Sequence, residues 1–211
     1  MRKLVLFIHS TLNGVVTGDP SKDKTDFAAW TRAGNIIKEG PENNLLKILD
    51  TVDTILLGRG TYEDLVRKWP SVKGAPGGGV VSRLADKINN ARKLVAIGGH
   101  PVGELKWGDF AAAEQLAGDV EERIRDLKNG DGGDIVIFGS PKLVRSLTDA
   151  NLIDEYHILV HPVVVNVGER LFDDLAAQKD LHLVDVKPLK EGAILVTYRP
   201  AWTVPPSSAA T

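Results

Sequence analysis

The sequence has no cysteine, no apolar stretch long enough to span a membrane, and no excess of charge of one sign. Without cysteine there is no disulfide framework, no thiolate metal site and no cysteine nucleophile. The apolar run Leu4–Ile8 ends at His9, which is too early for the apolar core of a signal peptide. The net charge of -2 and the lack of a dense Lys/Arg run argue against nucleic-acid binding. We therefore expect a cytoplasmic protein that binds neither nucleic acid nor membrane.

Length and composition favour one compact domain. The chain has 211 residues, of which 43% are hydrophobic and 26% charged, which is ordinary for a globular protein with a large core. We place this domain at residues 1–200 and a C-terminal tail at residues 201–211, where Pro and Ser become frequent.

One stretch, residues 134–172, predicts a strand, a tight turn, a helix and a second strand. The uninterrupted apolar run 135–138 is typical of a strand covered on both faces. Gly139 breaks the run, Ser140 is a favourable N-cap and Pro141 a favourable first helical residue. Asn151 is placed to end the helix in a left-handed conformation, and the next strand is expected at Tyr156–Val165.

A strand that passes through Gly139 and Ser140 into a helix presents free backbone amides at the positive end of the helix dipole, which is an anion site. Helix-end electrostatics contribute only roughly 0.3–1 kcal/mol when exposed, so a phosphate here also needs basic side chains or further amides. The alternative is that the segment is only a well-capped connection.

Two more strands end in glycine. The run 54–57 leads into Gly58-Arg59-Gly60-Thr61, with Thr61 as a candidate cap and Arg59 as a bidentate phosphate ligand. The run 94–97 leads into Gly98-Gly99-His100. Neither matches the dinucleotide fingerprint or the P-loop. If the three strands are parallel and adjacent, their glycine junctions lie along one rim, and one long phosphate-bearing ligand can touch all three.

The remaining pattern places helices at residues 42–50, 80–90 and 119–128, a helical turn at 176–179 and a closing hairpin of strands 182–186 and 193–198, while residues 101–118 show no clear pattern. Helices that alternate with buried strands before a final hairpin predict an α/β protein. We expect a three-layer α/β/α fold with a mostly parallel central sheet and an antiparallel C-terminal hairpin.

Four ordered motifs resemble the dihydrofolate reductase-like superfamily, and within it the reductase domain at the carboxyl end of the bifunctional riboflavin-biosynthesis deaminase-reductase. The motifs are Thr11-Leu12-Asn13-Gly14, the segment from Asp53 to Gly58-Arg59-Gly60-Thr61-Tyr62-Glu63, Ile137-Phe138-Gly139-Ser140, and Leu152-Ile153-Asp154-Glu155 followed by Pro162, Gly168 and Leu171-Phe172. Their order and spacing cover residues from about Lys3 to Pro200.

The resemblance implies an NADPH-dependent reductase of a small molecule, often a homodimer. It places the cofactor against Gly58, Arg59, Thr61, Gly139, Ser140 and the amides before Lys142 and Leu143, with its adenosine end near Gly98 and Gly99. The substrate is expected against Asn13, with Glu155 and His157 near the reacting carbon. Glu155 is the first candidate for a catalytic carboxylate and Asp26 the second. Residues 19–26 are polar and predict a surface loop. Trp30 follows this segment and is expected either in the core or in the wall of a pocket for a flat ring.

Two departures from the family pattern stand out: Asn13 replaces an aspartate and Asn166 replaces a glycine. The zinc deaminase motif requires cysteines, and this sequence has none, so we expect a stand-alone reductase domain. His157 and His161 share one face of a strand but lack a third ligand, so we expect no metal. The leading substrate is 5-amino-6-(5-phosphoribosylamino)uracil. The alternatives are dihydrofolate reduction and a non-catalytic dimeric module that binds a nucleotide or flavin.

Overall fold

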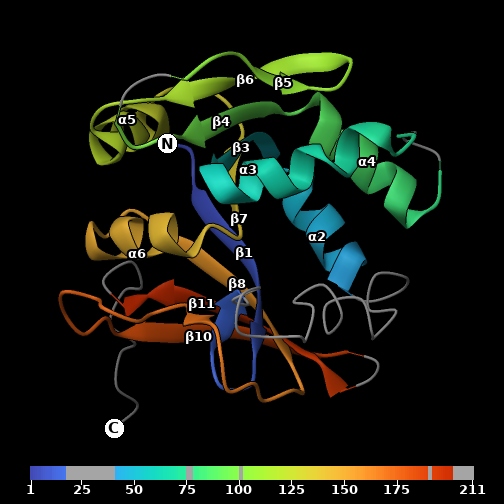
Figure 1. The fold of residues 1–211 in the computed structure, drawn as a ribbon. Helices are drawn as coiled ribbons and strands as arrows, with labels where there is room; N and C mark the ends of the chain where they lie inside the picture. Colours follow the sequence, from blue (N-terminus) through green and yellow to red (C-terminus); the bar gives the residue numbers. More distant parts are fainter. Residues whose placement is uncertain (18–40, 75–77, 100–101, 190–191, 202–211) are drawn as a thin grey trace, which may run out of the picture.

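The computed structural model describes residues 1–17, 41–74, 78–99, 102–189 and 192–201 (Figure 1). Its centre is a nine-stranded sheet in the order β10-β11-β8-β1-β7-β3-β4-β6-β5. The strands are β1 Leu4–Thr11, β3 Val52–Gly58, β4 Arg92–Ala96, β5 Leu105–Trp107, β6 Phe110–Leu116, β7 Asp134–Phe138, β8 Glu155–His161, β10 Leu181–Pro188 and β11 Ile194–Pro200. A second, two-stranded sheet pairs β2 (Val15–Thr17) with β9 (Glu169–Arg170).

The six strands from β8 to β6 are parallel, and antiparallel strands lie at both ends of the sheet. The prediction of a mostly parallel sheet with an antiparallel C-terminal hairpin is confirmed. The other antiparallel pair, β5 with β6, falls in the segment 101–118 that showed no clear pattern.

Helices cover both faces of the sheet, as a three-layer fold requires. They are α2 Pro41–Leu49, α3 Arg59–Val66, α4 Val80–Asn90, α5 Val120–Asn129 and α6 Pro141–Asp149, with a short 3₁₀ helix, η1, at Trp69–Ser71. Figure 1 shows α2, α3 and α4 on one side and α5 and α6 on the other. Strand β7 is buried on both faces, because Val136 and Phe138 pack in one core and Ile135 and Ile137 in the other. None of the helices in the described ranges is long and apolar enough to cross a membrane.

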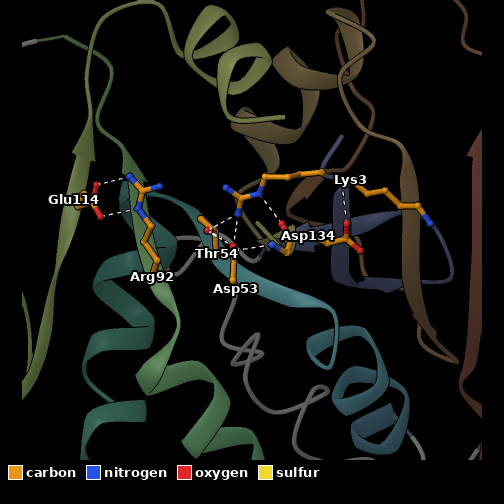
Figure 2. Close-up of polar contacts among 8 residues, drawn as sticks. Lys3, Asp53, Thr54, Arg92, Glu114 and Asp134 are labelled. Atoms are coloured by element: carbon orange, nitrogen blue, oxygen red, sulfur yellow. Dashed lines mark hydrogen bonds and ion pairs between the residues drawn. The ribbon is translucent and has the colours of Figure 1, made fainter. Parts of the chain in front are cut away.

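The amino ends of the strands are tied together by polar contacts that lie in a row across the sheet (Figure 2). The buried guanidinium of Arg2 binds the Asp53 carboxylate and donates to the Gly133 carbonyl oxygen at 2.6 Å. Asp53 also accepts from the Gly133 amide at 2.7 Å. Arg92 forms a bidentate pair with Glu114, at 2.7 and 2.6 Å. The first group of contacts joins the segment before β1 to β3 and to the residue before β7, and the second joins β4 to β6, so both stabilise this edge of the sheet.

Two local predictions are wrong. Residues 176 and 177 form a bend and residues 178 and 179 have no regular structure, so no helical turn forms there; the Ala176 amide donates to the Asp149 carboxylate at 3.1 Å instead. The strand predicted at 156–165 ends at His161, since Pro162 follows and has no amide to continue the ladder. The predicted left-handed end of α6 is confirmed, with φ 56° at Asn151.

Candidate cofactor and substrate site

The three glycine junctions lie on one rim of the sheet. Strands β7, β3 and β4 are adjacent and parallel, so Gly139, Gly58 and Gly98 leave the sheet at the same edge. This arrangement confirms the predicted rim. Helices α3 and α6 leave the neighbouring strands β3 and β7 toward opposite faces, since Tyr62 packs in one core and Val144 in the other. In open α/β sheets ligands bind at such a switch point. The region between the starts of α3 and α6 is called the crevice below.

Ser140 joins the two junctions at this crevice. Its hydroxyl accepts from the Gly58 amide at 2.7 Å and donates to the Phe138 carbonyl oxygen at 2.9 Å. Its own amide donates to the hydroxyl of Thr61 at 3.1 Å. Gly139 and Ser140 both adopt left-handed backbone conformations, with φ 53° and 60°. A Cβ at position 139 would lie 3.3 Å from Thr61 Oγ1, so glycine permits the close approach of the two junctions.

Both helices therefore start without a side-chain cap. Ser140 occupies the N-cap position of α6 and Pro141 is the first residue of the helix, as predicted, but the Ser140 hydroxyl bonds to the Gly58 amide and the Phe138 carbonyl oxygen and caps no amide of its own helix. The prediction of Thr61 as a cap is wrong, because Gly58 holds the N-cap position of α3 and the Thr61 hydroxyl accepts from the Ser140 amide. In α6 the first backbone bond to Ser140 comes from the Val144 amide, and Pro141 has no amide. The amides of Lys142 and Leu143 thus precede the helical ladder and have no partner in the part of the chain described. Two uncapped helix starts at one crevice favour an anion.

Arg59 is at this crevice as well. Its side chain is 57% exposed and pairs with Glu63 one turn later in α3, at 3.0 Å. Beside it, Gly60, Gly98 and Gly99 border open space, since a Cβ built at any of them would meet no atom within 4 Å. The structure thus places the predicted cofactor residues together, with room beside the backbone. His100 lies outside the described residues.

The predicted substrate residue Asn13 lies in the turn after β1, and both polar atoms of its side chain make hydrogen bonds within the protein. The amide nitrogen donates to the Val165 carbonyl oxygen at 2.7 Å. The amide oxygen accepts from the Thr11 hydroxyl at 2.8 Å and from the Val165 amide at 3.3 Å. These bonds explain why asparagine replaces the family's aspartate: a carboxylate cannot donate to Val165. These bonds fix the orientation of the Asn13 side chain, and its predicted contact with the substrate stays a prediction.

Glu155 and His157 are the first and third residues of β8. Through β1, Glu155 is in register with Val136 and His157 with Phe138, the residue that precedes Gly139 at the rim. His157 Nε2 lies 2.7 Å from one carboxylate oxygen of Glu155, and Arg199 Nε donates to the other at 2.8 Å. The hydrogen bond from His157, with a further one from Arg199, outweighs burial and lowers the pKa of Glu155 to about 2. The ionised carboxylate links β8 to β11 through Arg199, which gives it a structural role. The predicted roles of Glu155 and His157 beside the reacting carbon stay predictions.

Other expectations have different outcomes. Asp26 and Trp30 lie outside the described residues. Asn166 is not in a left-handed conformation, while Gly168 has φ 131° and packs so close to Thr17 that a Cβ would lie 2.4 Å from its carbonyl oxygen. Within the described ranges no three metal-ligating side chains gather.

Sequence reasoning missed His9, whose Nδ1 lies 2.9 Å from Nε2 of His161. The one signal in the sequence was a histidine that directly follows the apolar run of the first strand.

The sequence profile of the RibD C-terminal domain matches residues 2–195. The chain belongs to the RibD C-terminal domain family. Over 197 residues it is 24% identical to the uncharacterized protein YyaP of Bacillus subtilis (strain 168), covering 93% of this chain and 94% of YyaP. The family assignment agrees with the four motifs and with the rim that they build.

Solved structures show the same fold at low sequence identity. A putative riboflavin biosynthesis protein from Shewanella sp. PV-4 superposes with a TM-score of 0.69 at 17% identity, over 95% of this chain and 99% of that one. The Thermotoga maritima diaminohydroxyphosphoribosylaminopyrimidine deaminase/5-amino-6-(5-phosphoribosylamino)uracil reductase gives 0.53 at 18%, over 95% of this chain and 57% of that one. Dihydrofolate reductase from Enterococcus faecalis, solved with NADP(H), gives 0.52 at 16%, over 94% and 96%. This RibD C-terminal domain therefore has a dihydrofolate reductase-like fold.

Proposed function

We propose that this protein is an NADPH-dependent reductase and that its substrate is a phosphoribosylated aminopyrimidine, with 5-amino-6-(5-phosphoribosylamino)uracil as the first compound to test. The observation that carries the proposal is the pair of uncapped helix starts. The hydrogen bond between Gly58 and Ser140, which are 82 residues apart in sequence, holds these two starts together. Membership of a family of reductase-like domains supports the same reading.

The residues at the rim fit a dinucleotide. The amides of Lys142 and Leu143 and the first turn of α3 are suited to its pyrophosphate. The exposed guanidinium of Arg59 is suited to a further phosphate. The open space beside the backbone of Gly98 and Gly99 has room for a bulky group of the ligand. When bound, the nicotinamide supplies the hydride, and the protein supplies orientation and exclusion of water.

The first test is a calorimetric titration of the purified protein with NADPH and, separately, with NADH. We expect saturable micromolar binding of NADPH, followed by loss of reduced-nicotinamide absorbance when the aminopyrimidine is added. Dihydrofolate, run in parallel, distinguishes the two substrate classes. No binding of either nucleotide would contradict the proposal and favour a flavin-binding or non-catalytic module.

Arg59 provides a sharper version of this test. Charged hydrogen bonds contribute about 1.5–3 kcal/mol, so R59A is expected to weaken NADPH binding about tenfold. R125A is the matched control, because Arg125 forms a similar exposed pair with a glutamate one turn away on α5. E63Q removes the carboxylate that competes for Arg59 and is expected to strengthen binding. Equal affinity in R59A and the parent protein would remove Arg59 from the site.

A further inference from the structure

His9 lies beside the crevice, on the strand next to β7. Strand β1 pairs with β7 up to Phe7 and Phe138, and the Gly139 amide donates to the Phe7 carbonyl oxygen at 3.3 Å. His9 is two residues farther toward the carboxyl end and shares the sheet face of Phe7, whose ring meets it edge-on at 5.6 Å. Phe7 packs in the core beneath α3 and α2. The His9 imidazole therefore lies next to the glycine rim, on the face of the sheet that α3 covers.

His161, at the end of β8, holds this imidazole in place. Its Nε2 lies 2.9 Å from His9 Nδ1, and the two rings are stacked 5.2 Å apart with an interplanar angle of 15°. Burial lowers the pKa of His9 to about 3 and that of His161 to about 4. Both rings are therefore neutral near pH 7. When His161 donates to Nδ1 of His9, the proton of His9 sits on Nε2.

The hydroxyl groups near the end of β1 donate hydrogen bonds to other described residues, whereas Nε2 of His9 does not. The Ser10 hydroxyl donates to the Thr11 carbonyl oxygen at 2.9 Å, and the Thr11 hydroxyl donates to Asn13 at 2.8 Å. In the described part of the chain, Nε2 of His9 has no hydrogen-bond partner. A fully buried side-chain nitrogen without a partner occurs among the described residues at Nε of Arg83 and not at His9. Nε2 of His9 is therefore not sealed in the core. In the tautomer in which His161 donates to Nδ1 of His9, the Nε2–H of His9 is a neutral donor beside the crevice and is suited to a ligand.

We propose that His9, oriented by His161, donates a hydrogen bond from Nε2 to the oxygen or nitrogen acceptor of the substrate at the carbon that is reduced. The inference rests on the proposed reductase function and deepens it, because it names a substrate contact that no motif indicated. The bond strengthens as negative charge develops on the acceptor, which lowers the barrier without any transfer of the imidazole proton. The proton that finally neutralises the acceptor comes from solvent. Substrates must then carry a carbonyl or imine-type acceptor.

The kinetic test compares H9F and H9Q with the parent protein, using NADPH and 5-amino-6-(5-phosphoribosylamino)uracil. H9F removes the donor and keeps the ring, so kcat is expected to fall at least tenfold while NADPH affinity stays within about twofold. H9Q keeps an amide donor near the position of Nε2 and is expected to retain most of kcat. H182F is the control, because His182 is exposed on β10. Parent-like kcat and KM in H9F would overturn the inference and leave the proposed function standing.

A spectroscopic test does not depend on turnover. In protein labelled with ¹⁵N-histidine, adding the aminopyrimidine to the NADP⁺ complex is expected to shift the His9 Nε2 resonance and leave that of His182 unchanged. H161F is expected to alter the His9 tautomer before any ligand is added, which a packing role alone would not do. A His9 resonance that stays fixed while the aminopyrimidine binds overturns the inference alone. Absence of NADPH binding by the parent protein overturns the proposed function, and the inference with it.

Discussion

The Gly58 amide donates to the Ser140 hydroxyl at 2.7 Å, and this bond ties the two helix starts of the candidate site to each other. Ser140 is 6% exposed, so S140A leaves the Gly58 amide without an acceptor in a site with little access to water. Such a loss costs about 1–3 kcal/mol, and we expect the free energy of unfolding in urea to fall by this amount. S140G loses the same bond but relieves the left-handed strain at φ 60°, so it is expected to be the more stable of the two variants.

Ser146 supplies the control for this prediction. It lies on the same helix, is exposed, and its hydroxyl lies 3.0 Å from a carboxylate oxygen of Glu121. S146A is expected to change stability by less than about 0.5 kcal/mol. If S140A unfolds no more easily than S146A, the bond across the crevice does not stabilise the rim.

The rim itself was predictable because local signals fix it. The apolar run before Gly139, the Ser-Pro pair and the glycines after β3 and β4 each specify how a strand ends, and parallel pairing then brings those ends together. The direction of the Ser140 hydroxyl was not predictable. It depends on β3 lying next to β7, and the two strands are far apart in the chain. The same reason hid the pairing of His9 with His161, which are separated by 152 residues.

Strand β6 was missed for a different reason. Residues 110–116 read Phe-Ala-Ala-Ala-Glu-Gln-Leu, and alanine, glutamate and glutamine favour helix over strand. Tertiary pairing overrides this preference, because β6 lies against β4 and β5, and Ala113 and Leu116 are buried. Glu155 shows the limit of inference from a motif: the motif finds the residue, but its ion pair with Arg199 and its hydrogen bond with His157 come from parts of the fold that the motif does not describe.

Asn13 provides a prediction with a pH signature. In N13D the carboxylate faces the Val165 carbonyl oxygen, to which Asn13 donates at 2.7 Å, so one bond is replaced by repulsion. We expect N13D to be less stable than the parent protein by about 1–3 kcal/mol at pH 7. The difference should shrink as the pH falls toward the range in which the new carboxyl takes up a proton and can donate again. Urea titrations at pH 7 and pH 4 measure both values.

The control is N90D on α4. The Asn90 side chain donates to the backbone carbonyl oxygen of Asp86 at 2.9 Å and to its carboxylate at 3.1 Å, but in an exposed setting where water and salt screen the repulsion between carboxylates. We expect a change of less than about 0.5 kcal/mol there. Equal effects of N13D and N90D would mean that the turn after β1 tolerates a carboxylate.

Glu155 is expected to matter for stability and not for turnover. Its pKa is lowered to about 2, so its ion pairs contribute fully above the ordinary value near 4.5 and are lost as the pH falls from 4.5 toward 2. E155Q is expected to lower the unfolding free energy at pH 7 by about 1–3 kcal/mol and to flatten its fall below pH 4.5. D185N, which breaks an exposed pair with Lys187, should leave both quantities near those of the parent protein. A large loss of kcat in E155Q without a loss of stability would restore Glu155 as a catalytic residue.

Lys93 is expected to make the protein more stable in mild base. Its side chain is 2% exposed, and its ammonium donates to the carbonyl oxygens of Asn89 and Ala91, at 2.6 and 2.7 Å. It lies 5.1 Å from the ring centre of Trp107. In the described part of the chain it has no carboxylate partner, and burial lowers its pKa from 10.5 to about 8.

Because the folded state releases the Lys93 proton at a lower pH than the unfolded state, unfolding takes up a proton between about pH 8 and 10.5, and the unfolding free energy rises with pH in that window. Each pKa unit corresponds to about 1.4 kcal/mol, so the rise from this residue is on the order of 3 kcal/mol. K93M removes the titrating group and is expected to abolish the rise, as measured by urea unfolding from pH 7 to pH 10.5. K87M, which removes a lysine of α4 that pairs with Asp50, should keep this rise with pH. If K93M and the parent protein show the same slope, Lys93 gains enough from its carbonyl and aromatic partners to remain charged in the core.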